Sequence, residues 1–173
     1  MQTSFTDKQL LDKDNKSSES ILRKCVHCGM CNATCPTFCV NGEELEGPRG
    51  RIYLIKDMLE NKKPANKKVV KHIDSCLSCY SCMTTCPSGV NYMHLIDHGR
   101  NYVEETYKRP FFDRLFRNVL SFVLPRPKVF LVLAYLTKLI KPFSFLLPTF
   151  FKNSLKLMPN KIPSKKIETQ KTY

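Results

Sequence analysis

Long runs of apolar residues are missing from this 173-residue sequence. A helix that spans a membrane needs roughly 18–20 such residues in a row, whereas charges or prolines interrupt every apolar stretch after Pro110. The N-terminus, Met1-Gln2-Thr3-Ser4, also lacks the apolar core of a secretory signal. We therefore expect a cytoplasmic protein with reduced thiols. Its nine cysteines then predict metal ligation rather than a disulfide framework.

Several other signals are absent as well. The six glycines form no dinucleotide-binding loop, and no nucleophile–base pair stands out, so we predict no catalytic residues in this chain. No stretch combines alternating polarity with hairpin turns, which argues against a β-rich fold. The net charge of +13 could attract acidic partners or anionic lipid. Because the sequence shows no basic stripe with interleaved aromatics, we expect no nucleic-acid partner.

Eight of the nine cysteines follow one spacing twice, C-x2-C-x2-C-x3-C-P. The first run is Cys25, Cys28, Cys31 and Cys35, and the second run is Cys76, Cys79, Cys82 and Cys86. Thiolates are soft ligands, and this spacing is the bacterial ferredoxin-type run for iron–sulfur ligation. The sequence therefore predicts two [4Fe-4S] clusters. Zinc is the main alternative metal, although structural zinc sites usually combine two C-x2-C pairs.

The fourth cysteine of each run lies beyond a turn. In two-cluster ferredoxins, this cysteine ligates the other cluster. We therefore predict a crossed arrangement, in which one cluster is bound by Cys25, Cys28, Cys31 and Cys86. The other cluster would be bound by Cys76, Cys79, Cys82 and Cys35. Crossing would tie the two halves of the domain together and bring the clusters within range of electron hopping.

The other reactive or charged side chains near the runs have a plainer interpretation. Cys39 could be an alternative ligand or a redox-active thiol, but we favour a small buried hydrophobe beside a cluster. His27 could tune its cluster or couple a proton, but we favour a loop residue at a polar edge. Arg49 and Arg51 could lie near a cluster or face solvent. Three histidines in predicted helices are expected to be structural or exposed: His72, His94 and His98.

Helical periodicity predicts a mainly α-helical fold. Pro48 suits the first position of a helix that extends to Glu60, and apolar residues at 52, 55, 58 and 59 share one of its faces. A shorter helix is expected around residues 69–73, and Asn91 is a plausible N-cap of a helix to about Tyr107. Because the gap between the runs holds two helices, we expect an α-helical ferredoxin domain followed by amphipathic helices.

Composition divides the chain into four segments. We expect a polar N-terminal segment at 1–20 that frays, the cluster-binding domain at 21–107, an apolar and basic helical segment at 110–158, and a flexible tail or linker at 159–173. Two apolar helical stripes in the third segment must be covered by something. A partner or missing domain is the interpretation we favour, ahead of a membrane surface and of packing between the stripes.

Three stretches resemble the iron–sulfur subunit of bacterial glycolate oxidase, also called glycolate dehydrogenase. They are the first cysteine run at 25–37, the segment at 42–56 and the second run at 82–92. The cysteine runs alone are generic. The segment Gly-Pro-Arg-Gly-Arg-Ile-Tyr-Leu-Ile-Lys at 47–56 is much more discriminating. The likeness covers most of residues 1–107 and weakens beyond them.

The resemblance implies an electron-transfer subunit of an oxidoreductase. In that family, FAD-containing partner subunits oxidise glycolate or another 2-hydroxyacid, and the iron–sulfur subunit passes electrons towards the quinone pool. The resemblance implies a cytoplasmic location, including a peripheral one on the inner face of the cell membrane. The same module would suit an anaerobic glycerol-3-phosphate dehydrogenase, a lactate-utilisation or a heterodisulfide-reductase-type complex, and a structural metal-binding module is less favoured.

One departure from the family limits this interpretation. The family's subunit is normally longer and carries further cysteine-rich repeats, whereas no cysteine follows Cys86 in this chain. The chain is therefore expected to correspond to the N-terminal part of such a subunit.

Overall fold

The computed structural model describes residues 1–140, with side chains described as far as residue 137. The chain divides into two units, Met1–Lys108 and a second that begins at Arg109. All secondary structure in the described residues is helical, which confirms the mainly α fold class. The tail or linker expected at 159–173, and residues 141–158 of the expected helical segment, lie outside the described residues.

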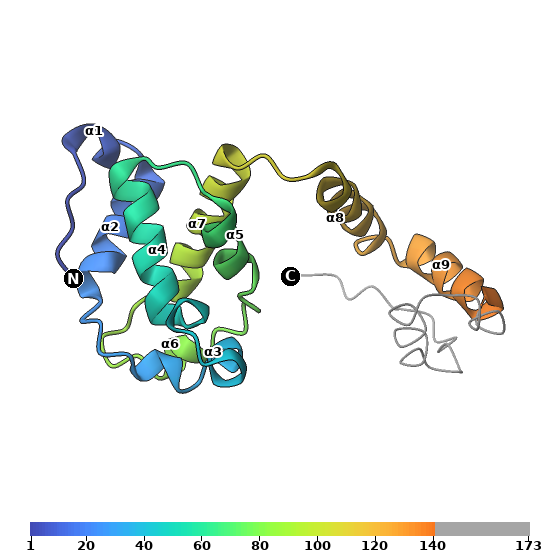
Figure 1. Ribbon diagram of the computed structural model, residues 1–173, viewed down its shortest axis with the longest axis horizontal. Helices are drawn as coiled ribbons and strands as arrows, with labels where there is room; N and C mark the ends of the chain where they lie inside the picture. Colours follow the sequence, from blue (N-terminus) through green and yellow to red (C-terminus); the bar gives the residue numbers. More distant parts are fainter. Residues whose placement is uncertain (141–173) are drawn as a thin grey trace, which may run out of the picture. The chain divides into compact units, whose positions relative to one another are not determined.

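The first unit contains seven α-helices and two short 3-10 helices, shown in Figure 1. In chain order they are α1 (Asp7–Leu10), α2 (Lys13–Lys24), η1 (Met30–Asn32), α3 (Pro36–Asn41), η2 (Glu44–Glu46), α4 (Pro48–Asn61), α5 (Lys67–Asp74), α6 (Ser81–Thr84) and α7 (Tyr92–Thr106).

Helices α4 and α7 form the centre of this unit, with α2 and α5 packed against them. The periodicity predicted for α4 is confirmed, because its apolar face is buried. On α7, Asn91 is the N-cap and its side chain accepts a hydrogen bond from the backbone N–H of His94. The core residues from the two helices are Ile52, Ile55, Met58, Leu59, Tyr92, Leu95, Ile96 and Val103. Gly99 allows the close approach, because a Cβ there would lie 2.8 Å from Cγ1 of Ile55.

The N-terminal 20 residues, whose polar composition favoured a frayed segment, form helix α1 and most of α2. Residues of α1 and α2 form long-range hydrogen bonds: the Gln9 side-chain amide donates to the carbonyl of Leu59 at 2.8 Å. The hydroxyl of Ser18 lies 2.7 Å from Nδ1 of His98 on α7. Burial of Gln9 and Ser18 is therefore compatible with their polarity, because both are paired.

The second unit contains α8 (Phe111–Val123) and α9 (Pro127–Ile140), shown in Figure 1. Pro127 begins α9, as suits a residue whose missing N–H would have no partner in the first helical turn. In the described residues, neither helix alone has the length and apolar composition needed to span a membrane. Together they meet those two criteria, but they are bent by 113°.

Candidate iron–sulfur centres

The two cysteine runs fold as two copies of one loop at the same end of the first unit. Each loop has two residues in the left-handed region of backbone conformation, and these occupy equivalent positions. In the first loop they are His27 and Gly29, with φ of 61° and 83°. In the second loop they are Ser78 and Tyr80, with φ of 52° and 55°. Because non-glycine residues rarely adopt this conformation, its recurrence shows that both runs follow the same path.

Equivalent residues of the two loops also meet. The hydroxyls of Thr34 and Thr85, which precede the fourth cysteine in each run, lie 2.9 Å apart. The Thr34 hydroxyl also donates to the carbonyl of Ser81 at 3.4 Å. Contact between equivalent positions is what an approximate twofold axis produces. The pair Thr34–Thr85 therefore marks the axis that relates the two loops.

Four predicted ligands line one cavity. Three come from the first run, Cys25, Cys28 and Cys31, and the fourth is Cys86 of the second run. Burial raises the pKa of the Cys31 thiol, and the neighbouring sulfurs of Cys25, Cys86 and Cys28 raise it further. Cys82 of the second run also lines this cavity. Thiols of the second run therefore lie directly beside those of the first.

The second group of thiols surrounds Cys82. Burial, together with the neighbouring sulfurs of Cys31, Cys76, Cys35 and Cys79, raises the pKa of Cys82 to about 12. Cys35 of the first run is therefore close enough to Cys82 to act on it electrostatically, as are Cys31, Cys76 and Cys79. Exposure differs within each group, since Cys25, Cys35 and Cys82 are buried while Cys28 and Cys79 are exposed. Four of the thiols that crossed ligation would need thus line one cavity, and Cys35 lies within electrostatic range of Cys82.

The cysteines of the two runs are suitable ligands for iron–sulfur clusters. Each run supplies four thiols, and no carboxylate lines the cavity around Cys25. Apolar side chains also line that cavity, among them Ile52 and Val90. Soft sulfur donors favour iron–sulfur clusters or zinc over Mg²⁺ and Ca²⁺, which prefer oxygen. Polar groups in hydrogen-bonding range of the sulfurs tune the potential of an iron–sulfur cluster.

Several such groups approach sulfur atoms of the runs. In the first group of thiols, Val90 N lies 3.5 Å from Cys86 Sγ and His27 Nδ1 lies 3.8 Å from Cys25 Sγ. Cys35 Sγ lies 3.2 Å from Thr37 Oγ1 and 3.8 Å from Arg51 Nη1, and Cys76 Sγ lies 3.7 Å from Tyr92 Oη.

Arg51 is the charged member of this set and is 1% exposed. Its guanidinium donates from Nη2 to a carboxylate oxygen of Glu46 at 2.9 Å, and from Nε to the carbonyl of His72 at 2.7 Å. A buried ion pair is stable only when its remaining donors and acceptors are satisfied. Here Thr37 and Ser75 complete the shell around Nη2, each at 3.0 Å. Of the two environments considered for Arg51, the structure places it beside a cysteine and away from solvent.

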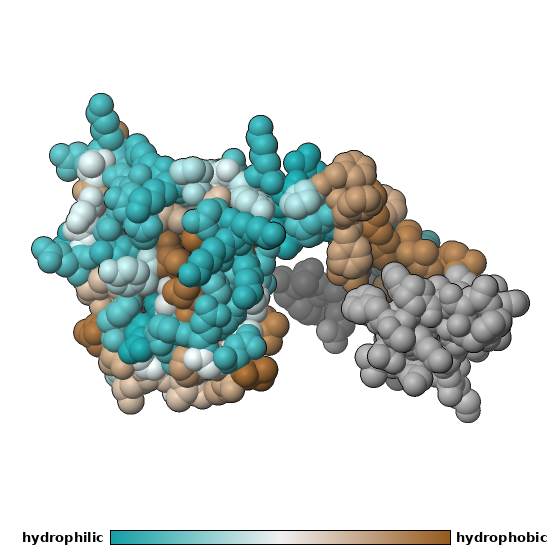
Figure 2. Space-filling model, viewed as in Figure 1, coloured by the Kyte–Doolittle hydropathy of each residue, from teal (hydrophilic) through white to brown (hydrophobic). Residues whose placement is uncertain are grey.

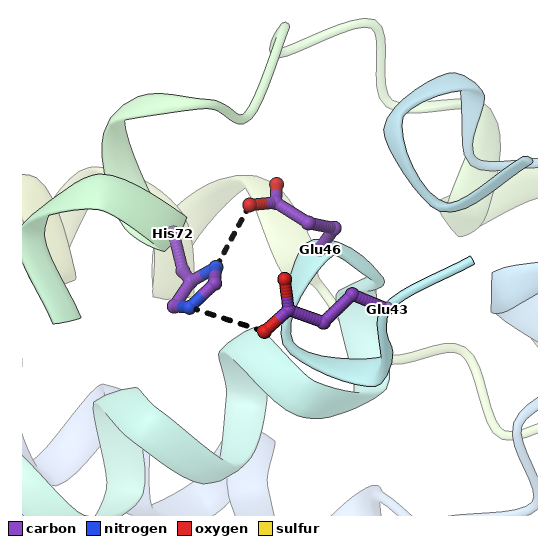
Figure 3. A group of neighbouring side chains, drawn as sticks. All are labelled: Glu43, Glu46 and His72. Carbon is purple, nitrogen blue, oxygen red and sulfur yellow. Dashed lines mark hydrogen bonds and ion pairs between the residues drawn. The ribbon is translucent and has the colours of Figure 1, made fainter. Parts of the chain in front are cut away.

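Figure 3 shows the acidic side of this network, where His72 lies between Glu46 and Glu43. Nδ1 of His72 is 2.8 Å from Glu46, and Nε2 is 3.7 Å from Glu43. Burial raises the pKa of the Glu46 carboxyl, but hydrogen bonds with Ser75 and His72 and the charges of His72 and Arg51 lower it overall. The three side chains are close enough to chelate a cation, but Arg51 already supplies a positive charge to Glu46. We interpret the group as the support that fixes Arg51 against Cys35.

Arg49 occupies a different position, beside the first loop. It forms an ion pair with Glu44, and a Cβ added to Gly29 would clash with its guanidinium. The pKa of Arg49 is raised, chiefly by Glu44, with contributions from the sulfurs of Cys31 and Cys28. The two clustered groups of thiols therefore have different cationic neighbours, Arg49 half-buried on one side and Arg51 buried on the other.

Two side chains differ from the favoured sequence interpretation. Cys39, expected to be a buried hydrophobe, is exposed on α3, and its thiol donates to the carbonyl of Ala33 at 3.4 Å. Its place near the end of a short helix turns it away from the core. His27 is more than a loop residue at a polar edge, because it lines the cavity and contacts Cys25. Burial, with the charge of Arg49, lowers the pKa of the His27 imidazole.

The role of Glu46 was not predicted from the sequence, and no local signal could have revealed it. Glu46 meets His72 and Ser75 across 26 and 29 positions of the chain. Only the fold brings these residues together.

Comparison with known proteins agrees with this geometry. Residues 21–90 match the family described as a 4Fe-4S dicluster domain. The chain is 49% identical over 143 residues to the glycolate oxidase iron–sulfur subunit of Escherichia coli (strain K12), an alignment that covers 83% of this chain and 35% of that protein. It is 32% identical over 117 residues to the probable glycolate oxidase iron–sulfur subunit of Bacillus subtilis (strain 168), covering 65% of this chain and 26% of that protein.

A more distant relative belongs to another complex. The mitochondrial succinate dehydrogenase [ubiquinone] iron–sulfur subunit of Candida glabrata is 27% identical over 84 residues, which cover 45% of this chain and 33% of that protein. The chain thus spans about a quarter to a third of the length of these curated relatives. No solved structure matches the chain significantly. Residues 21–90 therefore belong to the 4Fe-4S dicluster domain family, within a chain that is related to the N-terminal part of glycolate oxidase iron–sulfur subunits.

Proposed function

We propose that the first unit binds two [4Fe-4S] clusters with exchanged fourth ligands. Cys25, Cys28, Cys31 and Cys86 would hold one cluster, and Cys76, Cys79, Cys82 and Cys35 would hold the other. Two observations support this proposal: Cys86 lines one cavity with Cys25, Cys28 and Cys31, and Cys35 is near enough to Cys82 to raise the pKa of that thiol. Bound clusters of this type each exchange one electron at a time.

The function that follows is electron transfer within a larger dehydrogenase complex. We infer that the chain takes electrons from a FAD-containing subunit that oxidises glycolate or another 2-hydroxyacid, and passes them towards a membrane quinone. The names of the two glycolate oxidase relatives support this donor. The exposed residues Cys28 and Cys79 offer one accessible edge in each group, as a chain that receives and delivers electrons requires.

The protein's own side chains would tune these transfers. Arg51 presents a buried positive charge to Cys35, and the hydroxyl of Tyr92 contacts Cys76. Both belong to the group around Cys82, and Arg51 is buried, whereas Arg49 beside the other group is only half-buried. Positive charge near a cluster favours its more negative, reduced form, because electron uptake adds negative charge. We therefore expect the group around Cys82 to have the higher reduction potential.

Anaerobic reconstitution tests the cofactor. About eight iron and eight sulfide per chain are expected, together with reversible reduction followed by electron paramagnetic resonance. Zinc as the bound metal, or clusters that cannot be reduced, would overturn the proposal.

Single cysteine substitutions test the crossing. Cys86→Ser should weaken the cluster of Cys25, Cys28 and Cys31, whereas the matched variant Cys35→Ser should weaken the other cluster. The two clusters are distinguished by their paramagnetic resonance signals. If Cys86→Ser affects only the cluster held by Cys76, Cys79 and Cys82, ligation is not crossed.

Co-purification with flavoprotein subunits, followed by a substrate panel, tests the donor. Reduction of the clusters by glycolate or lactate through the flavoprotein is the expected result. The clusters could instead be reduced only by glycerol-3-phosphate, or the chain could associate with a lactate-utilisation or heterodisulfide-reductase-type complex. Either result would support the electron-transfer role but show that the electron donor is a different protein.

A further inference from the structure

Helix α8 separates its residues by polarity with no exceptions. At 3.6 residues per turn, every apolar side chain of Phe111–Val123 falls on one half of the helix surface. The opposite side carries only polar and charged residues: Asp113, Arg114, Arg117, Asn118 and Ser121. A helix with one complete apolar face must place that face against an apolar surface.

Within the described residues of the second unit, this face stays exposed. Phe112 is 81% exposed, and Phe111, Phe116 and Phe122 are also exposed. In α9 the large side chains of Phe130, Val132 and Tyr135 are exposed as well. Figure 2 shows the result as hydrophobic surface over α8 and α9. So large an exposed apolar surface marks an interaction site.

The charge of the chain is concentrated in the same region. Residues 109–173 contain 13 Lys and Arg and two Asp and Glu, whereas residues 1–108 contain 15 and 13. Nearly all of the net charge of +13 therefore belongs to the part of the sequence that begins with α8 and α9. The described part of this region, residues 109–140, contains six Lys and Arg and one acidic residue. An apolar helix face in such a basic segment is complementary to anionic lipid, which offers an acyl interior beneath negative headgroups.

The geometry of the helices suits a position along the membrane surface. Thirteen residues of α8 extend only about 20 Å, short of the roughly 30 Å hydrocarbon core of a bilayer. At the bend after α8, the guanidinium of Arg126 lies 3.9 Å from the ring centroid of Phe122. A basic group on an aromatic ring at a helix end is suited to the boundary between headgroups and acyl chains.

We propose that α8 and α9 bind the surface of an anionic membrane, with the apolar face of α8 inserted at the level of the acyl boundary. The occupant is the lipid bilayer itself, and the basic residues around the helices contact its headgroups. This inference goes beyond electron transfer and does not depend on it. Membrane binding would keep the first unit close to a membrane-bound acceptor.

Vesicle binding by the full reconstituted chain tests the proposal. We expect the chain to float with vesicles of phosphatidylcholine containing about 30% phosphatidylglycerol, and to bind pure phosphatidylcholine at least about tenfold more weakly. Added salt should reduce the binding, because exposed charges are screened. Equal binding to both kinds of vesicle, or no binding to either, would overturn the proposal.

Two sets of variants locate the contact. Replacing Phe112 and Phe116 together, as Phe112→Ser and Phe116→Ser, should weaken vesicle binding at least about tenfold. The matched control is Leu11→Ser with Val40→Ser, which removes two equally exposed apolar side chains from the first unit and should leave binding unchanged. Iron content, measured for each variant, should stay constant. Loss of vesicle binding with intact clusters separates this proposal from the proposed function.

The absence of tryptophan from the chain allows a direct probe of insertion. Phe116→Trp introduces a single tryptophan, whose emission should shift to shorter wavelength when anionic vesicles are added. Leu11→Trp, the control in the first unit, should show no shift. If Phe116→Trp shifts instead on self-association, or on adding a purified flavoprotein subunit that also blocks vesicle binding, another protein covers this face and the proposal fails.

Discussion

Arg51 shows how a single residue connects the stability of this protein to its redox chemistry. Its guanidinium is buried, paired with Glu46 and held near Cys35. The same positive charge that neutralises a buried carboxylate is therefore presented to a candidate cluster ligand. A substitution at this position should change both folding stability and reduction potential.

Arg51→Gln should destabilise the first unit by about 3–5 kcal/mol, because the Glu46 carboxylate would stay buried without its partner. It should also lower the reduction potential of the cluster near Cys35. Urea unfolding and a potentiometric titration would measure the two effects. Arg51→Lys is the control, since it keeps the charge but loses the planar fork. An unchanged potential in Arg51→Gln would show that Arg51 is purely structural.

His98 makes a second prediction at this scale. Burial lowers the pKa of its imidazole, with only partial opposition from the charge of Asp14. The folded state therefore takes up this proton at a lower pH than the unfolded chain, which takes it up near pH 6.5. Its contribution to stability is complete above that pH and is lost as the pH falls below it.

The free energy of unfolding should therefore decline between about pH 7.5 and pH 5.5, and it should decline less steeply in His98→Gln. Urea denaturation followed by circular dichroism at several pH values would measure this. Identical pH dependence in the two proteins would mean that burial of His98 does not shift its titration.

At the scale of elements, the packing of α4 against α7 depends on the missing side chain of Gly99. Gly99→Ala would gain up to about 1 kcal/mol of helix propensity. However, its new methyl group would meet Ile55, and overpacking of this kind costs about 1–3 kcal/mol. We expect net destabilisation, measured by thermal or urea unfolding. Because Ile55→Ala creates the needed space, the double variant should be more stable than the sum of the single effects predicts. Strict additivity would contradict the contact.

The elements also show what the sequence could predict. The bounds of α4 and α7 followed from local signals: a proline at the first position, an asparagine N-cap and an apolar face. The paired cysteine runs were visible because their spacing is local too. By contrast, α1 and α2 are ordered by contacts from Gln9 and Ser18 to distant helices. Neither those contacts nor the Glu46–His72 pair leaves a trace in the neighbouring sequence.

At the scale of the whole molecule, the division after Lys108 separates the cysteine runs from the exposed apolar helices. All eight cysteines of the two runs lie in the first unit. A chain ending at Lys108 should therefore keep about eight iron and lose vesicle binding. Iron analysis and flotation would measure the two properties. Loss of iron from this shortened chain would show that the second unit is needed to assemble the clusters.

The contact between Thr34 and Thr85 has a consequence for the direction of electron flow. Two loops with the same backbone path, joined at an axis, would begin as equivalent carriers with no preferred order between them. Any difference in electron affinity must then come from the few side chains that break the equivalence, such as buried Arg51 on one side and half-buried Arg49 on the other. Single substitutions at these side chains would therefore set the direction of electron transfer between the two clusters. Other substitutions there could reverse that direction without changing the fold.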